Sequence, residues 1–200
     1  MSHQHRPHDL VLASTSPWRK ALLESAGIRV LCRAPGVDES AYAADGPISL
    51  ARVLACAKAD AVARAHPEDL VLGADQVAWD GVETFGKPAN VEDHFRRLCS
   101  MRGRVHELVT AVCLRGLMMD VCFEEITRMH VRADISDEEI RRYVETGEGS
   151  GCAGGYAAEA LGMFLFERVE GCWQNVIGLP VPRVLTELRR GGWRFGGSNA

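Results

Sequence analysis

The sequence predicts an α/β fold in which a mixed β-sheet is flanked by helices. Apolar runs of strand length, such as Leu10–Ala13 and Asp69–Ala74, alternate with segments whose apolar residues recur at helical spacing. Start signals separate the two kinds of segment, because Pro17, Asn90 and Ser136 each stand at the beginning of a helical pattern. Such alternation is typical of α/β domains.

Local signals justify the elements of the first half. Ser16 can cap the first helix, and Pro17 fits its first position, where the N–H that proline lacks has no helical partner. Gly27 ends this helix, and helical spacing after Ser49 predicts a second, longer helix that Pro67 ends. The expected elements are a strand over 10–13, a helix over 17–26, a strand over 28–33, a helix over 49–66, a strand over 69–74 that delivers Asp75 and Gln76 at its C-terminal end, and a hairpin over 77–85 about Asp80-Gly81.

The second half is interpreted in the same way. Asn90 is expected to cap a helix with acidic residues in its first turn. Ser136 and Glu139 form a capping-box pattern, which starts a helix that Thr146-Gly147 stops. The expected elements are a helix from 91, strands over 105–114 and 121–133 connected through Arg115-Gly116, a helix over 137–144, a glycine-rich stretch without regular structure over 147–155, strands over 163–169 and 173–177, and a helix over 182–190.

Composition restricts the classes of protein. The chain has 200 residues, 46% of them hydrophobic, and a net charge of −4, which suits one globular domain and gives no basic footprint for nucleic acid. No apolar run reaches the roughly 18 residues that a membrane span needs, and the N-terminal segment lacks the apolar core of a signal peptide. We expect a cytoplasmic protein with one domain over 10–190, a flexible tail over 1–9 and a frayed tail over 191–200.

The seven cysteines are odd in number and scattered, and no two are spaced as C-x-x-C. In a protein without an export signal, they are expected to be reduced thiols that behave mostly as small buried apolar residues. The pattern gives little support for a zinc site or a disulfide framework. These cysteines are Cys32, Cys56, Cys99, Cys113, Cys122, Cys152 and Cys172.

The turn between the first strand and the first helix is a candidate anion site. Ser14, Thr15 and Ser16 place hydroxyl groups beside a helix N-terminus, whose free N–H groups and dipole favour negative charge, and Arg19 adds a cation. Trp18 is unusual there, because a large aromatic residue precedes the apolar face of the helix. Packing of this tryptophan on a neighbouring element is the ordinary alternative.

Charged residues elsewhere are further candidates. Asp75 stands out because a carboxylate at the end of a buried strand is costly unless it is hydrogen-bonded or bound to a metal, although it could also cap the next turn. Lys87 could be a solvated loop residue, and Lys58 could extend its ammonium group to water. Alternatively, Glu39 and Asp75 could hold a divalent cation while Arg19, Lys58 and Lys87 neutralise phosphates.

Several short motifs resemble, in the same order, those of the Maf family of nucleotide pyrophosphatases, over about Leu10 to Leu188. The motifs are Ala13-Ser14-Thr15-Ser16-Pro17-Trp18-Arg19, Val37-Asp38-Glu39, Ala55–Ala59 with Lys58, Gly73-Ala74-Asp75-Gln76, Gly86-Lys87-Pro88, Thr110, Cys152-Ala153-Gly154 and Gly178-Leu179-Pro180. The resemblance implies a bent mixed sheet with two lobes around a cleft, similar to inosine triphosphate pyrophosphatases. It also implies hydrolysis of nucleoside triphosphates to the monophosphate and pyrophosphate with Mg²⁺ or Mn²⁺, and a homodimer.

By this resemblance Asp75 accepts a proton from water, Glu39 and Asp75 hold the metal, and Lys58 and Lys87 stabilise charge. The turn that contains Ser14, Ser16 and Arg19 is then expected to cradle phosphate. Stabilisation of this kind is what attack at phosphorus requires.

Three positions bear on the base of the nucleotide. Members of the family that favour dTTP and UTP have arginine, threonine and glutamine where this chain has Trp18, Gln76 and Glu159. The trio in this chain resembles the subfamily that acts on 7-methyl-GTP. A cationic methylated guanine stacks well on indole, and a carboxylate can accept hydrogen bonds from its N1–H and N2 amine. The alternatives are a pyrophosphatase for other canonical or modified nucleotides, and a nucleotide-binding regulator of septum formation and cell division.

Overall fold

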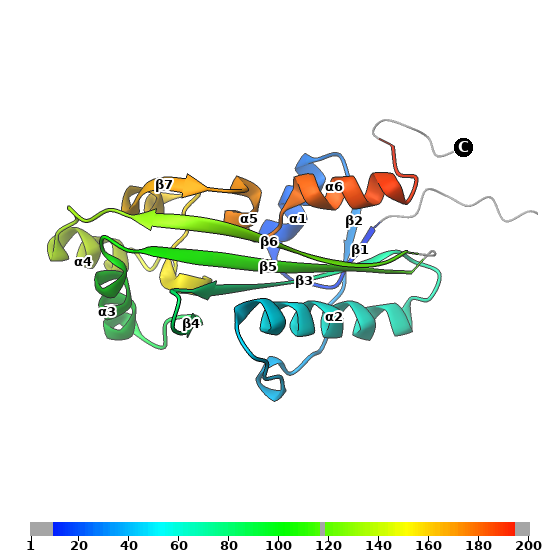
Figure 1. Ribbon diagram of the computed structural model, residues 1–200, viewed down its shortest axis with the longest axis horizontal. Helices are drawn as coiled ribbons and strands as arrows, with labels where there is room; N and C mark the ends of the chain where they lie inside the picture. Colours follow the sequence, from blue (N-terminus) through cyan, green and yellow to red (C-terminus); the bar gives the residue numbers. More distant parts are fainter. Residues whose placement is uncertain (1–9, 117–118, 195–200) are drawn as a thin grey trace, which may run out of the picture. The chain divides into compact units, whose positions relative to one another are not determined.

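The computed structural model describes residues 10–116 and 119–194 (Figure 1). Its strands and helices alternate along most of the chain, and three short 3-10 helices, η1 to η3, lie between them. The elements in chain order are β1 Leu10–Leu12, α1 Pro17–Ser25, β2 Val30–Cys32, η1 Glu39–Ala41, α2 Pro47–Ala65, β3 Val71–Trp79, β4 Thr84–Phe85, α3 Val91–Met101, β5 Val105–Gly116, β6 Met119–Val131, α4 Asp137–Glu145, η2 Ala153–Gly155, η3 Leu161–Leu165, β7 Phe166–Glu170, α5 Trp173–Ile177 and α6 Val181–Arg190.

The seven strands form one mixed sheet with the order β2-β1-β3-β5-β6-β7, and β4 pairs with β3. Strand β1 is parallel to both β2 and β3, whereas the β3–β4 and β6–β7 pairs are antiparallel. The expected mixed α/β fold is therefore confirmed. Each helix in the described part of the chain is too short or too polar to cross a bilayer.

The chain divides into two compact units, each built from separate stretches of sequence. The first unit contains residues 1–75, 110–124 and 178–200, and the second contains 76–109 and 125–177. The chain crosses between the units within β3, β5 and β6, and again after α5. Three of these four crossings therefore lie inside strands.

In the first unit, strand residues alternate between two helix-covered faces. Leu10 and Leu12 pack in a cluster with residues of α1 and α6, whereas Val11 packs with Val62 of α2 and Val71 of β3. Successive strand side chains point to opposite faces of a sheet, so this alternation places α1 and α6 on one face and α2 on the other (Figure 1). A strand that is apolar at every position is thereby buried on both sides.

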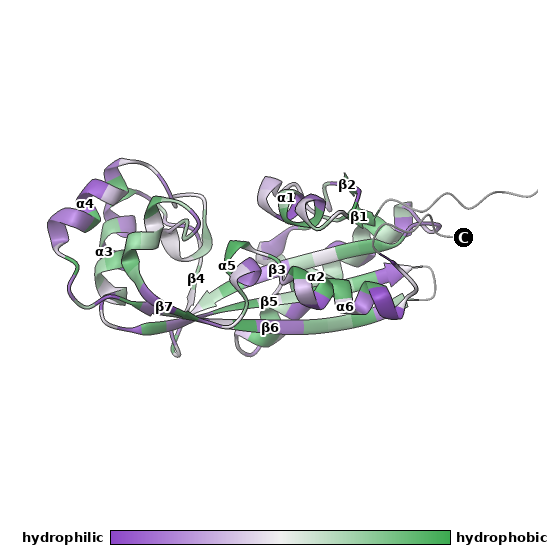
Figure 2. Ribbon diagram, turned by 90° about the horizontal axis from the view of Figure 1, so that it is seen from above, coloured by the Kyte–Doolittle hydropathy of each residue, from purple (hydrophilic) through white to green (hydrophobic). Residues whose placement is uncertain are grey.

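In the second unit, amphipathic helices provide the core. Helix α4 is mostly hydrophilic (Figure 2), yet Ile140, Tyr143 and Val144 are buried and join a cluster with Leu98 of α3. These three positions recur at helical spacing, which gives α4 one apolar stripe. The cluster extends to strand residues such as Met129.

Most expected elements are confirmed within one to three residues at their ends, and several caps occur as predicted. Ser16 Oγ accepts a hydrogen bond from the Arg19 N–H, and Asn90 Oδ1 accepts one from the Asp93 N–H. Ser136 forms a complete capping box at the start of α4. The tails over 1–9 and 195–200, and the centre of the connection after Gly116, lie outside the described residues.

Four expectations about elements are wrong. The predicted strand over 173–177 is helix α5, and the predicted strand over 163–169 begins only at Phe166, after η3. The stretch over 147–155, which was expected to lack regular structure, contains η2 at Ala153–Gly155. Strand β3 continues through Asp75 and Gln76 to Trp79, so these residues lie in the middle of a strand and not at its end.

The expectation that all cysteines are reduced is also wrong. Cys113 and Cys122, on β5 and β6, form a disulfide with a Cα–Cα distance of 4.3 Å. Spacing along the sequence could not reveal this pair, because it depends on how two strands align in the sheet. The other five cysteines are free thiols.

Candidate active site

The N-terminus of α1 forms a turn held by its own hydroxyl groups. Ser14 is buried, and its Oγ accepts a hydrogen bond of 3.1 Å from the Ser16 N–H. Ser16 Oγ in turn caps the helix by accepting from the Arg19 N–H at 3.4 Å. The predicted strand–turn–helix arrangement is present, and it directs a helix N-terminus toward this turn.

Arg19 connects three distant segments of the first unit. Its Nε donates to the Gly178 carbonyl at 3.0 Å, and its Nη1 donates to the Ala74 carbonyl at 2.8 Å. Burial lowers the pKa of this guanidinium, while the negative charges of Asp75 and Glu39 raise it. Arginine remains protonated in such a setting. The cation is therefore fixed beside the two carboxylates, and Nη2 is the nitrogen that these two bonds do not use.

Lys58, Asp75 and Glu39 form an ionic cluster, which we call the Lys58 cluster. The buried Lys58 Nζ lies 2.6 Å from Asp75 Oδ1 and 2.7 Å from Glu39 Oε1. Asp75 is as deeply buried as Lys58, whereas the Glu39 side chain is 57% exposed. The structure thus brings together three residues that the sequence predicted for catalysis, and Lys58 does not extend to water.

Gly73 allows α2 to approach β3 closely enough for this cluster to form. A Cβ atom at position 73 would lie 2.4 Å from the Ala55 carbonyl oxygen and 2.6 Å from the Ala59 nitrogen. Only glycine fits such a contact with a helix backbone. Lys58 lies in the same turn of α2 as Ala55 and Ala59, so this contact sets its distance from Asp75.

Opposing influences act on the Asp75 carboxyl group. Burial raises the pKa of Asp75, while the charge and hydrogen bond of Lys58 and the charge of Arg19 lower it. The pKa remains raised above its ordinary value, with a further contribution from Glu39. A buried carboxylate with a raised pKa is a stronger base than an exposed one, which is a property of catalytic carboxylates.

Trp18 lies in the first turn of α1, next to Arg19, and is 53% exposed. It does not contribute to the core of the first unit. The ordinary alternative, a tryptophan buried against a neighbouring element, is therefore not what the structure shows. A large aromatic surface remains accessible beside the helix N-terminus.

The other predicted site residues belong to the second unit. Gln76 Nε2 donates to the Asn175 carbonyl at 2.6 Å, so this amide ties β3 to α5. Lys87 is exposed and Glu159 is partly buried, and the charges of both act on the Cys152 thiol. Burial raises the pKa of Cys152, Glu159 raises it further and Lys87 lowers it. Lys87 and Glu159 therefore both lie near Cys152.

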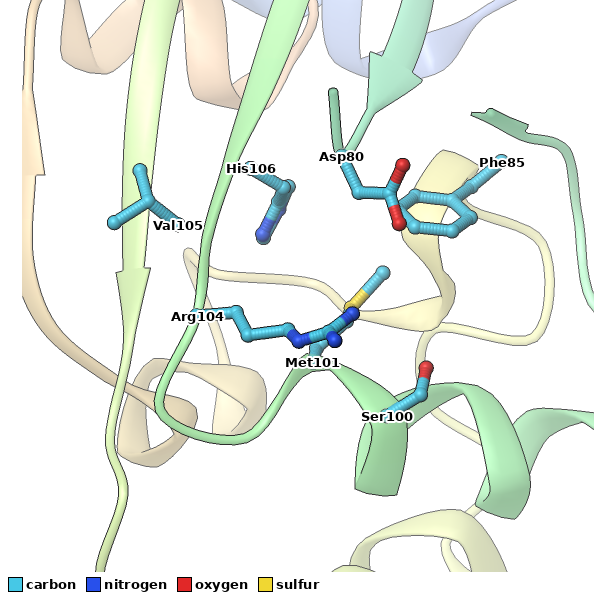
Figure 3. Close-up of a pocket in the computed structure, with 7 residues that line it drawn as sticks. All are labelled: Asp80, Phe85, Ser100, Met101, Arg104, Val105 and His106. Carbon is cyan, nitrogen blue, oxygen red and sulfur yellow. The ribbon is translucent and has the colours of Figure 1, made fainter. Parts of the chain in front are cut away.

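A pocket in the second unit is separate from these residues. His106 is buried there, its Nε2 pairs with the Tyr156 hydroxyl, and its Nδ1 has no partner among the described residues. In Figure 3, Val105 points away from the side chains that converge on the pocket. Burial lowers the pKa of His106 to about 4, against a smaller opposing effect of Asp80. The lining residues are Asp80, Phe85, Ser100, Met101, Arg104, Val105 and His106.

Sequence reasoning missed the groups that position the cluster. Gly73 was part of a motif, but its close contact with α2 was not predicted, and the carbonyls of Ala74 and Gly178 carry no side-chain signal. Gly178 adopts a φ of 126°, which favours glycine. The isolated glycine inside the apolar run before Asp75 was the available signal for a close backbone approach.

The first unit thus combines a helix N-terminus with a buried carboxylate–lysine pair and a fixed arginine. The family described as Maf-like protein matches residues 9–191 of this chain. The chain therefore belongs to the Maf family, as the sequence motifs indicated.

Several relatives match almost the whole chain. A Synechocystis sp. (strain ATCC 27184 / PCC 6803 / Kazusa) protein named nucleoside triphosphate pyrophosphatase is 41% identical over 94% of this chain and 96% of its own length. A Syntrophomonas wolfei protein named dTTP/UTP pyrophosphatase is 37% identical over 90% of this chain and 96% of its own length. Among solved structures, the Staphylococcus aureus Ham1 protein gives a TM-score of 0.45 at 16% identity, over 62% of this chain and 72% of that one.

Proposed function

We propose that this protein is a nucleoside triphosphate pyrophosphatase that releases the monophosphate and pyrophosphate. The observation that carries the proposal is the Lys58 cluster, in which a buried carboxylate with a raised pKa is paired with a buried lysine. The cluster lies in a unit that also presents a helix N-terminus and Arg19. The names of the Synechocystis and Syntrophomonas relatives support the same reaction.

In the proposed reaction Asp75 accepts a proton from a water molecule, and that water attacks phosphorus. The bond between this phosphorus and the bridging oxygen breaks, and pyrophosphate leaves with the negative charge. Lys58 favours the ionised form of Asp75 before the reaction, because its ammonium group lies 2.6 Å from the carboxylate. Positive charge near the phosphates stabilises the leaving group.

A divalent cation, Mg²⁺ or Mn²⁺, is part of the proposal. Asp75 Oδ1 and Glu39 Oε1 converge on one lysine nitrogen, so the two carboxylates face the same region. Carboxylate oxygens together with water and substrate phosphates are the usual ligands of Mg²⁺, and Glu39 and Asp75 fit that set. When bound, the cation would offset negative charge on the triphosphate.

For the phosphates, we propose the turn that contains Ser14, Ser16 and Arg19, and we propose Lys87 as a further cation on the family resemblance. The Ser16 cap fixes the turn, and Arg19 is already held by two carbonyls. Binding of the phosphates therefore costs little conformational entropy in these groups. Donors that are already fixed in place stabilise the charge of the transition state better than water does, because they do not have to reorient.

For the base, we propose 7-methyl-guanine. Trp18 offers an exposed indole, and a cationic ring stacked on indole gains roughly 0.5–2 kcal/mol. We propose that Glu159 accepts hydrogen bonds from guanine N1–H and the N2 amine, as a carboxylate can and a glutamine cannot. We propose that Gln76, whose amide is bonded to the Asn175 carbonyl, also takes part in binding the substrate.

The experiment is a panel of nucleotides with the purified protein and Mg²⁺ or Mn²⁺. Pyrophosphate release should be much faster from 7-methyl-GTP than from GTP, dTTP or UTP, and a chelator should abolish it. The double variant Trp18→Arg with Glu159→Gln should lose use of 7-methyl-GTP while retaining its fold. Equal or faster turnover of dTTP by the natural sequence would reject the proposed base specificity.

A second candidate is a dTTP/UTP pyrophosphatase, because relatives from Syntrophomonas wolfei and Koribacter versatilis carry that name at 37% and 39% identity. The same panel distinguishes it. Tight nucleotide binding without hydrolysis in the presence of metal would instead favour the regulator of cell division that the family resemblance raised.

A further inference from the structure

Three cysteine sulfur atoms lie together in the first unit, on three different elements. Cys56 is on α2, and its Sγ lies 2.9 Å from Cys113 Sγ of β5 and 3.4 Å from Cys122 Sγ of β6. Cys113 and Cys122 form the disulfide, so Cys56 is the free thiol of the group. We call these three residues the cysteine triad.

A cation lies next to the free thiol. Arg115 Nη2 donates to Cys56 Sγ at 3.4 Å, and Arg115 is held by Asp60 at 3.0 Å and by Asp120 at 2.7 Å. A guanidinium next to sulfur stabilises the thiolate, which is the nucleophilic form of cysteine. Burial acts in the opposite direction and raises the pKa of Cys56.

We propose that the cysteine triad is a thiol–disulfide exchange site, in which the disulfide moves between Cys113–Cys122 and Cys56–Cys113. The Cys56 thiolate attacks Cys113 Sγ, a bond forms between these two sulfurs, and the bond to Cys122 breaks. Cys122 leaves with the electron pair and takes up the proton that Cys56 has lost. The exchange is internally balanced and consumes no oxidant.

Distance and burial favour Cys113 as the sulfur that is attacked, once the Cys56 side chain has turned into line with the Cys113–Cys122 bond. It is the nearer of the two, and its side chain is fully buried, whereas Cys122 is partly exposed. Attack at Cys113 therefore releases the sulfur that can reach solvent as it becomes charged. Attack at Cys122 would leave a thiolate in the apolar interior, which is unfavourable.

Three converging sulfurs also suggest a soft-metal site, because thiolates bind Zn²⁺ and Cu⁺. Exchange is the better interpretation, since two of the sulfurs are already joined to each other and only a thiolate serves as a metal ligand. The experiment below distinguishes metal binding from exchange.

The test maps disulfides in the folded, full-length protein incubated with reduced and oxidised glutathione. Free thiols are blocked by alkylation, and the protein is digested with trypsin and analysed by mass spectrometry without reduction. Cleavage at Arg115 separates Cys113 from Cys122, so the two linkages give different peptides. Both the Cys113–Cys122 and the Cys56–Cys113 peptides are expected from the natural sequence.

Three cysteine variants test which sulfur atoms take part in the exchange. In Cys122→Ser, glutathione disulfide should oxidise Cys56 and Cys113 to a disulfide, with release of two reduced glutathione molecules and loss of Cys56 alkylation. In Cys56→Ser, Cys113–Cys122 should be the one linkage within the triad. The matched control Cys32→Ser removes a free thiol outside the triad and should leave both linkages unchanged.

Complete alkylation of Cys56 in the natural sequence at every glutathione ratio would overturn the proposal, and this arm does not depend on whether a variant folds. Retention of one stoichiometric Zn²⁺ by three reduced triad thiols would also overturn it, in favour of a metal site. The readout is a covalent linkage, so it is independent of any nucleotide activity.

Discussion

Asp75 is the residue on which the proposed chemistry depends, and Asp75→Asn tests it. An amide has nearly the same shape but cannot accept the proton from water, and it leaves Lys58 paired with Glu39 alone. Loss of a general base typically costs about 10²–10⁴-fold in kcat. We expect pyrophosphate release to fall by that amount, while circular dichroism remains that of the natural protein.

A matched control for this variant is Asp134→Asn, because the Asp134 side chain is 80% exposed and lies far along the sequence from Asp75. The control should retain its full rate. Near-normal turnover in Asp75→Asn would remove Asp75 from the reaction and would reject the proposed mechanism.

His106 should make stability depend on pH. Its pKa is about 4 in the folded protein, against an ordinary value of 6.5, so the unfolded chain binds more protons between these two values. The free energy of unfolding contributed by neutral His106 is therefore fully present above pH 6.5 and decreases as the pH falls toward 4. The total change is about 3 kcal/mol.

Urea denaturation of the natural sequence and of His106→Gln, measured between pH 7 and 4, would check this dependence. The variant should lose less stability on acidification, because glutamine does not titrate. His66→Gln is the control, since the His66 side chain is partly exposed. The assignment fails if the two variants show the same acid slope as the natural sequence.

At the scale of elements, the contact between α2 and β3 positions the Lys58 cluster. Gly73→Ala places a methyl group 2.4 Å from the Ala55 carbonyl oxygen, so the helix backbone must move. Overpacking of this kind costs about 1–3 kcal/mol, and a shift of α2 also displaces Lys58 from Asp75. We expect a lower thermal midpoint together with reduced turnover.

Gly151→Ala is the control for this substitution, because a Cβ at position 151 meets nothing within 4 Å. It should leave the thermal midpoint and the rate unchanged. Full activity in Gly73→Ala would show that the close approach of α2 is not required for the cluster.

The capping box of α4 offers a test of local stability. Ser136 Oγ accepts from the Glu139 N–H, and the Glu139 carboxylate accepts from the Ser136 N–H at 2.8 Å. Ser136→Ala should cost about 1 kcal/mol in the free energy of unfolding, measured by chemical denaturation, with no effect on the Lys58 cluster. A neutral substitution would mean that packing of Ile140 and Tyr143 alone defines the helix start.

Elements with strong end signals could be predicted from the sequence, and those without them could not. Ser16, Asn90 and Ser136 marked helix starts that the structure confirms. The run over 173–177 is too short for periodicity to separate strand from helix, and the buried Asn175 amide, bonded to the Leu108 carbonyl, belongs to a helix. Tertiary contacts therefore determine that residues 173–177 form a helix.

At the scale of the whole molecule, the sequence predicted which residues carry charge at the candidate site but not how they are held. The sequence predicted that Lys58 and Asp75 take part in the same reaction, and the structure shows that the two side chains are in direct contact. The supporting groups are backbone carbonyls and a missing Cβ at Gly73, which have no chemical signature in a sequence. The disulfide of Cys113 and Cys122 was missed for a related reason, because the spacing of residues along the chain does not show how two strands align in a sheet.

The two carbonyl contacts of Arg19 have a consequence for the order in which the chain folds. Arg19 donates to the carbonyl of Ala74, which is 55 positions further along the chain, and to that of Gly178, which is 159 positions further along. Its guanidinium therefore closes one loop of moderate length and one very long loop. Contacts of such high sequence separation form late, since their loop-closure entropy must be offset by structure already present. During synthesis, the arginine can reach its final position only after Gly178 has been added to the chain, and until then Asp75 and Glu39 lack the cation that the finished protein fixes beside them.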